Sequence, residues 1–247
     1  MPKVKKSPCF ERIIVKLSGE SLMGNRSGGI DPPTLKDMAS EIRSAHRLGV
    51  KIGIVMGGGN IFRGITSSEY AIGRVTADYM GMLATVINAL ALREVLEAIG
   101  VPATAMSALS IDRALEPYTR EKALTCLDEG RIVIFASGTG NPFFTTDTAA
   151  SLRAMEINAQ AILKATQVDG VYDRDPALEP GAKLYTRISY NQVLQDRLKV
   201  IDLTAISMAM EQRIPIIVFN VRKQGNIAKI ISGKTVGTTI AGAGDER

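Results

Sequence analysis

Short apolar runs rich in β-branched residues alternate along this chain with longer stretches whose apolar residues recur at helical spacing. Residues 12–17 read Arg-Ile-Ile-Val-Lys-Leu, the pattern of a buried strand, and residues 35–48 show the spacing of an amphipathic helix. Alternation of this kind is typical of a parallel sheet covered by helices on both faces. The pattern therefore predicts an α/β fold, a three-layer α/β/α sandwich around a mainly parallel central sheet.

The alternation continues to the end of the chain. No internal repeat or low-complexity linker interrupts it, so we expect one domain over residues 1–247 with two functional halves. Between residues 169 and 181 it loosens into turn-forming residues, which favours a loop at the edge of a ligand site. Further strands are predicted at residues 50–56, 101–105, 131–136, 159–164, 216–220 and 237–240, and further helices at 148–155, 201–212 and 226–232.

Residues 79–92 form the most apolar stretch of the chain. It is shorter than the ~20 residues that a membrane-spanning helix needs, and Gly81, Thr85 and Asn88 interrupt it. A helix that is apolar around its circumference is buried, either in the core or between subunits. We expect this one to form a contact between subunits, and we expect no membrane association.

Composition narrows the class of protein. The 45% hydrophobic and 22% charged residues are ordinary for a globular protein of this length. Cys9 and Cys126 lie far apart and form neither a disulfide framework nor a metal-ligand spacing. The basic residues 1–6 are not followed by the apolar segment of a secretory signal, so a cytoplasmic location is expected. The net charge of +5 is dispersed among few aromatic residues, which favours small anions over nucleic acid as ligands.

Four loops follow predicted strands, and open α/β sheets build ligand sites at the ends of their strands. The first loop places Lys16 at a strand end, ahead of Ser18 and Gly19. Lysine supplies a compact positive charge, and glycine lets a phosphate approach the backbone. A strand-end lysine is also common as a plain surface residue, so this loop gains meaning only together with the others.

The second loop has three consecutive glycines at 57–59, followed by Asn60 and Arg63. Glycines expose backbone N–H groups that can hold an anion, and the planar guanidinium of Arg63 suits a phosphate. A simple tight turn is the alternative, although three glycines cost more conformational entropy than such a turn requires.

Two familiar phosphate motifs do not fit. A dinucleotide-binding GxGxxG pattern requires glycine where this chain has Phe62. The end of a Walker loop is suggested by residues 233–235, but Ala228 stands where its first glycine belongs, and a predicted strand follows instead of a helix.

The third loop, residues 137–147, joins glycines and threonines to the start of a predicted helix, a combination that suits phosphate binding. Asp147 is suited either to cap that helix or to act in the site. The fourth loop follows Lys164, a second lysine near a strand end, and contains Tyr172 and Asp175 in a polar turn.

Together these loops resemble the amino acid kinase superfamily, and within it the bacterial uridylate kinases, over roughly residues 12–240. No departure from the family pattern is visible at the most specific positions. These are the segments 16–20, 57–60, 62–64, 78–82, 139–147, 164–166 and 168–172.

The resemblance implies transfer of the γ-phosphoryl group of ATP to UMP. Such transfer depends on positioning and on neutralising phosphate oxygens, so it requires no histidine base, and the one histidine, His46, lies on a predicted helix. We hypothesise that Lys16 stabilises the transferring group with help from Arg63 and Lys164, and that Asp147 orients lysines or water bound to magnesium. All four residues lie at or just beyond strand ends.

The resemblance also implies which residues bind each nucleotide. Asp78 is expected to accept a hydrogen bond from a sugar hydroxyl, because a carboxylate beside a phosphate would repel it. The ATP side comprises Lys16, Leu17, Ser18, Gly19, Gly59, Arg63, Thr166, Tyr172 and Asp175. The UMP side comprises Gly58, Asp78, Thr139, Gly140, Asn141, Pro142, Phe143, Phe144, Thr145 and Thr146.

Regulation and assembly are implied in the same way. Members of the family are homohexamers that use Mg²⁺, and many are activated by GTP and inhibited by UTP. The GTP-responsive segment corresponds to Gly24, Asn25, Arg26, Ser27, Gly28 and Gly29. We assign no residue of this chain as a metal ligand.

Two other functions remain open at this point. A kinase of the same fold could phosphorylate a carboxylate, as acetylglutamate and aspartate kinases do, although the loop 139–146 resembles that of the nucleoside monophosphate kinases. A nucleotide-binding sensor without catalysis could dispense with Lys16, Arg63 or Asp147, yet all three are present.

Overall fold

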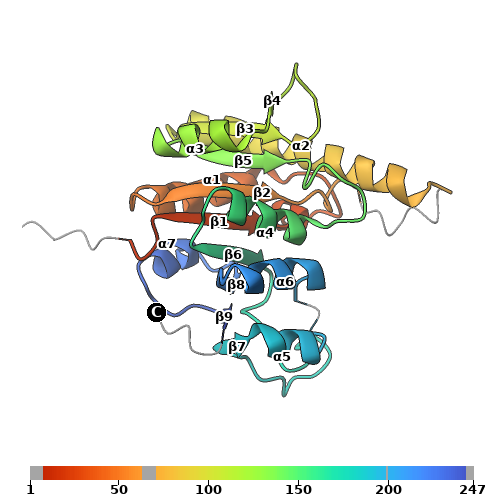
Figure 1. Ribbon diagram of the computed structural model, residues 1–247, viewed down its shortest axis with the longest axis vertical. Helices are drawn as coiled ribbons and strands as arrows, with labels where there is room; N and C mark the ends of the chain where they lie inside the picture. Colours follow the sequence, from red (N-terminus) through yellow and green to blue (C-terminus); the bar gives the residue numbers. More distant parts are fainter. Residues whose placement is uncertain (1–7, 63–70, 199, 243–247) are drawn as a thin grey trace, which may run out of the picture.

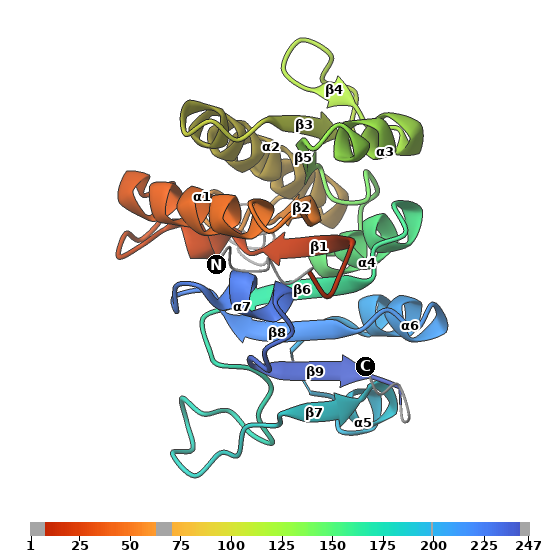
Figure 2. The same ribbon diagram turned by 90° about the vertical axis from the view of Figure 1, so that its left-hand side faces the viewer.

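The computed structural model describes residues 8–62, 71–198 and 200–242. Its centre is a nine-stranded sheet with the order β4-β3-β5-β2-β1-β6-β8-β9-β7, which runs from top to bottom in Figure 1 and Figure 2. The strands are β1 (Arg12–Leu17), β2 (Lys51–Met56), β3 (Ala103–Ser107), β4 (Glu116–Pro117), β5 (Ile132–Ala136), β6 (Ala161–Thr166), β7 (Arg187–Ser189), β8 (Ile216–Asn220) and β9 (Thr238–Ala241).

Helices cover both faces of this sheet (Figure 1). One hydrophobic cluster joins the sheet to α1, α2 and α7, and the other joins it to α3, α4, α5 and α6. The helices are η1 (Gly19–Leu22), α1 (Pro32–His46), α2 (Arg74–Ala98), α3 (Arg120–Asp128), α4 (Thr146–Glu156), α5 (Tyr190–Gln195), α6 (Leu203–Glu211) and α7 (Asn226–Ile231), of which η1 is a 3₁₀ turn. The predicted three-layer α/β/α sandwich is confirmed.

The central strand β1 shows why the two faces differ. Side chains of a strand alternate between faces, so Ile13, Val15 and Leu17 pack toward α1 and α7, while Ile14 packs toward α4. Lys16 lies two residues after Ile14, so its side chain points to the same face of the sheet. The end of this otherwise apolar strand therefore places one charged side chain on the α4 face.

The strand order reverses at β1, where the chain stops adding strands on one side of the sheet and begins to add them on the other. The chain goes from β1 to β2, β3 and β5 on one side, and then to β6 and β8 on the other. The pairs from β4 to β8 are parallel, and the antiparallel pair among the described strands is β8 with β9. Ligands of open α/β sheets bind at such a switch point, outside the carboxyl ends of the strands.

The predicted elements are present with small shifts of their ends. The strands β1 and β8 match the predicted bounds, whereas α1 begins three residues earlier than predicted, at Pro32. It begins there because Asp31 Oδ2 accepts a hydrogen bond from Thr34 N at 3.0 Å and proline suits the first turn. The sequence did not reveal β4, α3, β7 or α5, and β7 stands at the sheet edge beside β9, which corresponds to the strand predicted at residues 237–240. These elements have two to nine residues, so their periodicity is weak.

The long helix α2 has two different faces. At 25 residues it is longer than the predicted apolar stretch 79–92, so the prediction that it is too short to span a membrane was wrong, and by length and composition alone the helix could cross one. Its inner face nevertheless belongs to the core, and 44% of its most apolar window is buried. Its outer face carries Val75, Tyr79, Leu83 and Ile87 at four-residue spacing, each between 41% and 50% exposed. The predicted contact between subunits therefore has a candidate surface, and it stays a prediction.

A carboxylate of α1 caps α7 and joins the two helices on this face of the sheet. Glu41 accepts hydrogen bonds from the backbone N–H groups of Gly225 at 2.8 Å and Ile227 at 3.1 Å, where Gly225 itself offers no side chain. We predict that Glu41→Ala lowers the free energy of unfolding by about 1–2 kcal/mol, the usual cost of a lost helix cap. Urea unfolding would measure this loss.

The matched control is Glu211→Ala, which removes an exposed glutamate at the end of α6. We expect a change of no more than about 0.5 kcal/mol there. Equal effects of the two substitutions would contradict the capping role of Glu41.

Candidate active site

Two lysines lie side by side at the carboxyl edge of the sheet. Lys16 of β1 and Lys164 of β6 are register partners across the parallel pair, and each residue is only 8% exposed. Because the register pairs them directly, both side chains leave the sheet on the face covered by α4. Two ammonium groups in this position repel each other and lose hydration, so they need a counter-charge.

Asp147, in the first turn of α4, supplies that charge. Its Oδ1 lies 2.8 Å from Lys16 Nζ, and its Oδ2 accepts a hydrogen bond from Lys164 Nζ. The cap of α4 is Thr145, whose Oγ1 accepts a hydrogen bond from Asp147 N at 3.0 Å. Thr145 rather than Asp147 therefore caps α4, and the Asp147 carboxylate pairs with the two lysines, while its role in the site stays a prediction.

The charges of these three groups depend on one another. Burial by itself would raise the pKa of the Asp147 carboxyl, but the two adjacent ammonium groups outweigh it and hold that pKa below its usual value. Burial lowers the pKa of Lys164, and Lys16 adds to the effect, while Asp147 opposes it. The Asp147 carboxylate is therefore firmly ionised, and the Lys164 ammonium group loses its proton more easily than an ordinary lysine does.

The glycine loop after β2 lies directly against the turn after β1. Gly57 N donates to Leu17 O at 2.8 Å, and a Cβ at Gly57 would lie 2.7 Å from Gly19 N. Only glycine allows two backbones to approach this closely. The two loops therefore present their backbones as one surface beside Lys16. Arg63 and Gly64, which the sequence placed after this loop, lie outside the described residues.

A cavity of about 160 Å³ opens between the glycine loop, α2 and the loop that follows β5. From α2 it is lined by Ala77, Asp78, Gly81, Met82 and Thr85, which share one helical face. The remaining lining residues are Gly58, Gly59, Phe62, Gly138, Thr139, Asn141, Phe144, Thr145 and Thr146.

Most residues assigned to the acceptor side meet at this cavity, whereas Gly140, Pro142 and Phe143 do not line it. Sequence reasoning assigned no role to Met82, Thr85 or Gly138. Met82 and Thr85 could have been found from the sequence, because they lie four and seven positions after Asp78 and so fall on the same side of a helix.

The carboxylate of Asp78 joins two walls of the cavity. Its oxygens accept hydrogen bonds from Arg74 Nε at 2.8 and 2.9 Å, and its Oδ2 also accepts one from Phe143 N at 2.8 Å. Phe143 has a positive φ of 73°, which turns its N–H toward α2, and Arg74 lies over its ring with the guanidinium carbon 5.7 Å from the centroid. The charge of the Asp78 carboxylate is therefore already balanced by Arg74, and its Oδ1 can still accept a hydrogen bond from one more donor.

The residues of the fourth loop lie apart from the cavity, beyond β6. Thr166 Oγ1 donates to Val168 O at 2.8 Å, and Asp175 Oδ1 accepts from Ala177 N at 2.9 Å. Tyr172 pairs with Leu184 in an isolated antiparallel bridge. Thr166, Tyr172 and Asp175 are thus placed on the opposite side of the lysines from the acceptor-side residues.

The segment 24–29 lies against the back of the glycine loop. Gly29 N donates to Asn60 O at 2.7 Å, and Asn60 Nδ2 donates to Gly29 O at 2.9 Å. A change of conformation in this segment would therefore act directly on the loop. His46 lies elsewhere, with its Nε2 2.8 Å from Gly130 O.

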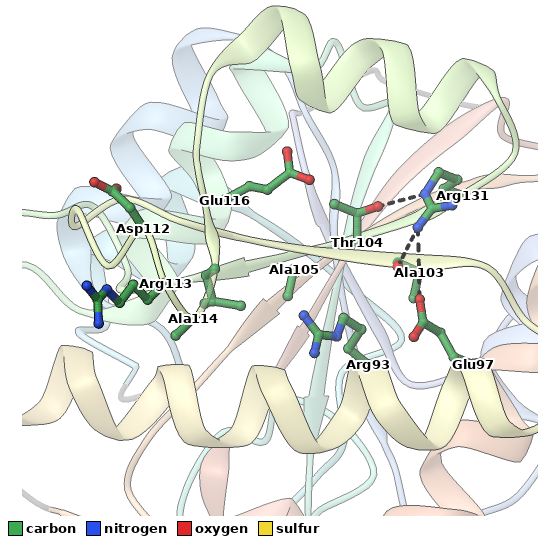
Figure 3. Close-up of a pocket in the computed structure, with 11 residues that line it drawn as sticks. Arg93, Glu97, Ala103, Thr104, Ala105, Asp112, Arg113, Ala114, Glu116 and Arg131 are labelled. Atoms are coloured by element: carbon green, nitrogen blue, oxygen red, sulfur yellow. Dashed lines mark hydrogen bonds and ion pairs between the residues drawn. The ribbon is translucent and has the colours of Figure 1, made fainter.

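A second cavity, of about 350 Å³, lies between α2, β3 and β4 (Figure 3). Arg131 lies at one end of it and donates to Thr104 Oγ1 at 2.7 Å and to Ala103 O at 2.9 Å, with Glu97 4.0 Å away. None of the residues that the sequence assigned to a site lines this cavity. Its arginines and carboxylates are mixed, so it differs in charge from the lysine pair.

Metal ligands are scarce at the site. Within the described ranges no three His, Cys, Asp or Glu side chains gather as a metal group. Asp147 is one carboxylate between two lysines, so the described residues do not form a protein cage for a divalent ion. An ion bound mainly through substrate oxygens remains compatible, since Mg²⁺ often takes only one or two protein carboxylates.

Comparison with known proteins places these features in a family. A model described as the amino acid kinase family matches residues 11–220. Two similar solved structures are a UMP kinase from Bacillus anthracis, with TM-score 0.92 and 40% identity over 94% of this chain and 96% of that one, and a UMP kinase from Ureaplasma parvum, with TM-score 0.89 and 37% identity over 94% and 98%. A uridylate kinase from Archaeoglobus fulgidus matches with TM-score 0.72 and 28% identity over 93% and 99%.

The lysine pair generates a prediction about stability. Asp147→Asn would leave two buried ammonium groups without a counter-charge, and we expect the free energy of unfolding at pH 7 to fall by about 3–5 kcal/mol. The depressed pKa of Asp147 contributes stability above the usual value of 3.8 and loses it as the pH falls through the lower folded-state pKa. The loss should therefore be as large at pH 5 as at pH 7, which urea unfolding would measure.

Asp128→Asn is the matched control, because Asp128 pairs with Lys51 at 2.9 Å but its side chain is 59% exposed. Exposed pairs contribute little to stability because water and salt screen them. A loss at Asp147 no larger than at Asp128 would refute the buried counter-charge.

Proposed function

The chain belongs to the amino acid kinase family, and we propose that it is a UMP kinase, which transfers the γ-phosphoryl group of ATP to UMP and yields UDP and ADP. The observation that carries this proposal is the buried lysine pair, bridged by Asp147 and placed beside the cavity of the glycine loop. Similarity to solved UMP kinases over 94% of the chain supports UMP as the acceptor.

The reaction needs charge neutralisation more than proton transfer. An oxygen of the UMP phosphate forms a bond to the γ-phosphorus while the bond to the β–γ bridging oxygen breaks, and that electron pair stays on ADP. Lys16 and Lys164 stabilise the transferring group and the leaving oxygen, because preorganised positive charge in a buried site is effective there. Asp147 holds both ammonium groups at the sheet end. Arg63 is proposed to help Lys16 stabilise the transferring group.

The two substrates occupy opposite sides of β1. UMP is assigned to the cavity side, with Gly58, Asp78 and the residues 139–146. Oδ1 of Asp78 has capacity for a sugar hydroxyl beside its bond to Arg74. ATP is assigned to the β6 side, with residues 16–19, Gly59, Arg63, Thr166, Tyr172 and Asp175. We keep one domain over residues 1–247, with the N-terminal half assigned mainly to the acceptor and to oligomer contacts and the C-terminal half mainly to ATP; residues 16–19 and 139–146 cross this division.

Mg²⁺ is proposed to enter as part of the MgATP substrate. The ion neutralises phosphate oxygens in phosphoryl transfer. The single carboxylate of Asp147 beside two lysines supports an ion held through ATP, with Asp147 orienting the lysines and water around it.

Assembly and location extend the proposal. The outer stripe of α2, formed by Val75, Tyr79, Leu83 and Ile87, supports an oligomer, because four large apolar side chains at helical spacing are otherwise left to water. We assign this stripe to a contact within a homohexamer. The absence of a disulfide framework in the sequence agrees with a cytoplasmic enzyme.

Effector control is proposed through the segment 24–29, with GTP as activator and UTP as inhibitor. The two hydrogen bonds between Gly29 and Asn60 support a route from this segment to the glycine loop. A ligand that favours one arrangement of the segment would shift the population of loop conformations by its differential affinity.

Acceptor choice is the decisive test of the proposed function. We predict that ATP with UMP gives ADP and UDP, and that UMP is preferred over CMP by kcat/KM. Aspartate and acetylglutamate should give no product. A coupled ADP-release assay with all four acceptors at equal concentration measures this. Product with a carboxylate would identify a carboxylate kinase, and no product with any acceptor would identify a non-catalytic binding protein.

The lysine pair yields a second prediction. Lys16→Ala should lower kcat by about 10²–10³-fold, the usual effect of removing one preorganised group that stabilises the transition state. Lys51→Ala is the matched control, because Lys51 lies at the other end of neighbouring β2 and pairs with exposed carboxylates. Steady-state kinetics of both variants, after circular dichroism has shown that they fold, measures the contrast. Wild-type turnover by folded Lys16→Ala would remove the central assignment.

A further inference from the structure

Asn88 is a polar residue in the middle of the apolar helix α2, and it is fully buried. A buried amide costs free energy unless its hydrogen-bonding groups are satisfied. A leucine at this position would contribute more to the core, so the asparagine points to a requirement other than packing. Its contacts identify that requirement.

The side chain of Asn88 holds the glycine loop from behind. Its Nδ2 donates to Gly57 O at 2.8 Å and to Asn60 Oδ1 at 2.7 Å. Its Oδ1 accepts from Asn60 Nδ2 at 3.0 Å, and the second hydrogen of that nitrogen goes to Gly29 O at 2.9 Å. Both amide groups therefore use every donor they have, and the network is closed.

The loop has little room to move relative to α2. A Cβ at Gly58 would lie 2.8 Å from Ala84 Cβ and 2.8 Å from Gly81 O, so the loop backbone is pressed onto the helix. Three residues before Asn88, Thr85 Oγ1 accepts a hydrogen bond from Ser137 N at 2.7 Å and so holds the loop after β5. One turn of α2 thus fixes both loops that frame the cavity.

We propose that Asn88 is a positioning residue for phosphoryl transfer: through Asn60 it fixes the glycine loop relative to Lys16, although it does not line the cavity itself. This role rests on the proposed kinase function. Groups that stabilise a transition state must be held within a fraction of an ångström, and a displacement of about 1 Å costs up to ~10²-fold in rate.

A positioning role and a purely structural role differ in their kinetics. Loss of an interaction needed only in the transition state lowers kcat while KM changes little. We expect Asn88→Ala to lower kcat at least about tenfold, and to change KM for ATP and for UMP by less than about threefold. If kcat of the folded variant stays within about twofold of wild type, the inference is overturned.

Leu92→Val is the matched control, because Leu92 is also fully buried and lies one turn further along α2. It removes core packing without touching either loop. We expect a lower midpoint of thermal unfolding with kcat within about twofold of wild type. A kcat loss in Leu92→Val equal to that in Asn88→Ala would mean that the helix is merely fragile and would overturn the inference.

The partner of Asn88 gives an independent check. Asn60→Ala breaks the same amide pair from the loop side, so it should lower kcat to a similar extent, and the double variant should lose little more than either single one. Multiplying losses would show that the two residues act separately and would overturn the inference. If Asn88→Ala does not fold, the kcat and KM of Asn60→Ala decide whether the amide pair positions the glycine loop.

Amide hydrogen exchange of residues 57–62 tests the geometry without catalysis. Exchange should be faster in Asn88→Ala than in wild type and unchanged in Leu92→Val, because only the first releases the loop. A wild-type protein that forms no UDP would refute the proposed function and leave this exchange test to decide the positioning role. Unchanged exchange of these residues in Asn88→Ala would overturn the positioning role of Asn88.

Discussion

The carboxyl edge of the sheet depends on one carboxylate placed between two buried ammonium groups. Lys16 and Lys164 are neighbours in register on β1 and β6, so their charges meet whether or not a ligand is present. Asp147 makes this tolerable because it offsets both the repulsion and the lost hydration. That in turn requires α4 to begin over these two strands. The left-handed backbone of Ser137, with φ 62°, redirects the chain as it leaves β5 toward α4.

The helix α2 combines three tasks that are usually divided among several elements. One face belongs to the core, two turns line the cavity with residues that include Asp78 and Thr85, and Thr85 and Asn88 hold the two loops from behind. The outer stripe remains exposed in the single chain. Anything that contacts that stripe would therefore contact the same helix that lines the cavity, which gives assembly a short physical route to the site.

The sequence indicated several residues that the structure brings together at the candidate site, and the contacts it did not indicate have a common cause. Lys16 and Lys164 were identifiable because each stands near the end of a β-branched run. Thr85 and Asn88 were visible only as polar interruptions of an apolar stretch, and nothing local indicates what they bond. Asp78 was expected to serve a ligand, yet its carboxylate is also held by Phe143 N, 65 residues away in the chain. The short elements β4, α3, β7 and α5 carry too few periods to be recognised.

The sequence by itself determined the α/β class, the strands whose ends carry polar loops, the kinds of charged group available and the likeness to the amino acid kinases. These follow from periods of 2 and 3.6 residues and from local turn chemistry, which neighbours along the chain impose. Only the tertiary structure decided that Lys16 and Lys164 pair in register, that Thr145 caps α4 and leaves Asp147 to the lysines, and that Asn88 reaches the glycine loop. Those contacts join distant segments, and close packing of the whole core fixes them.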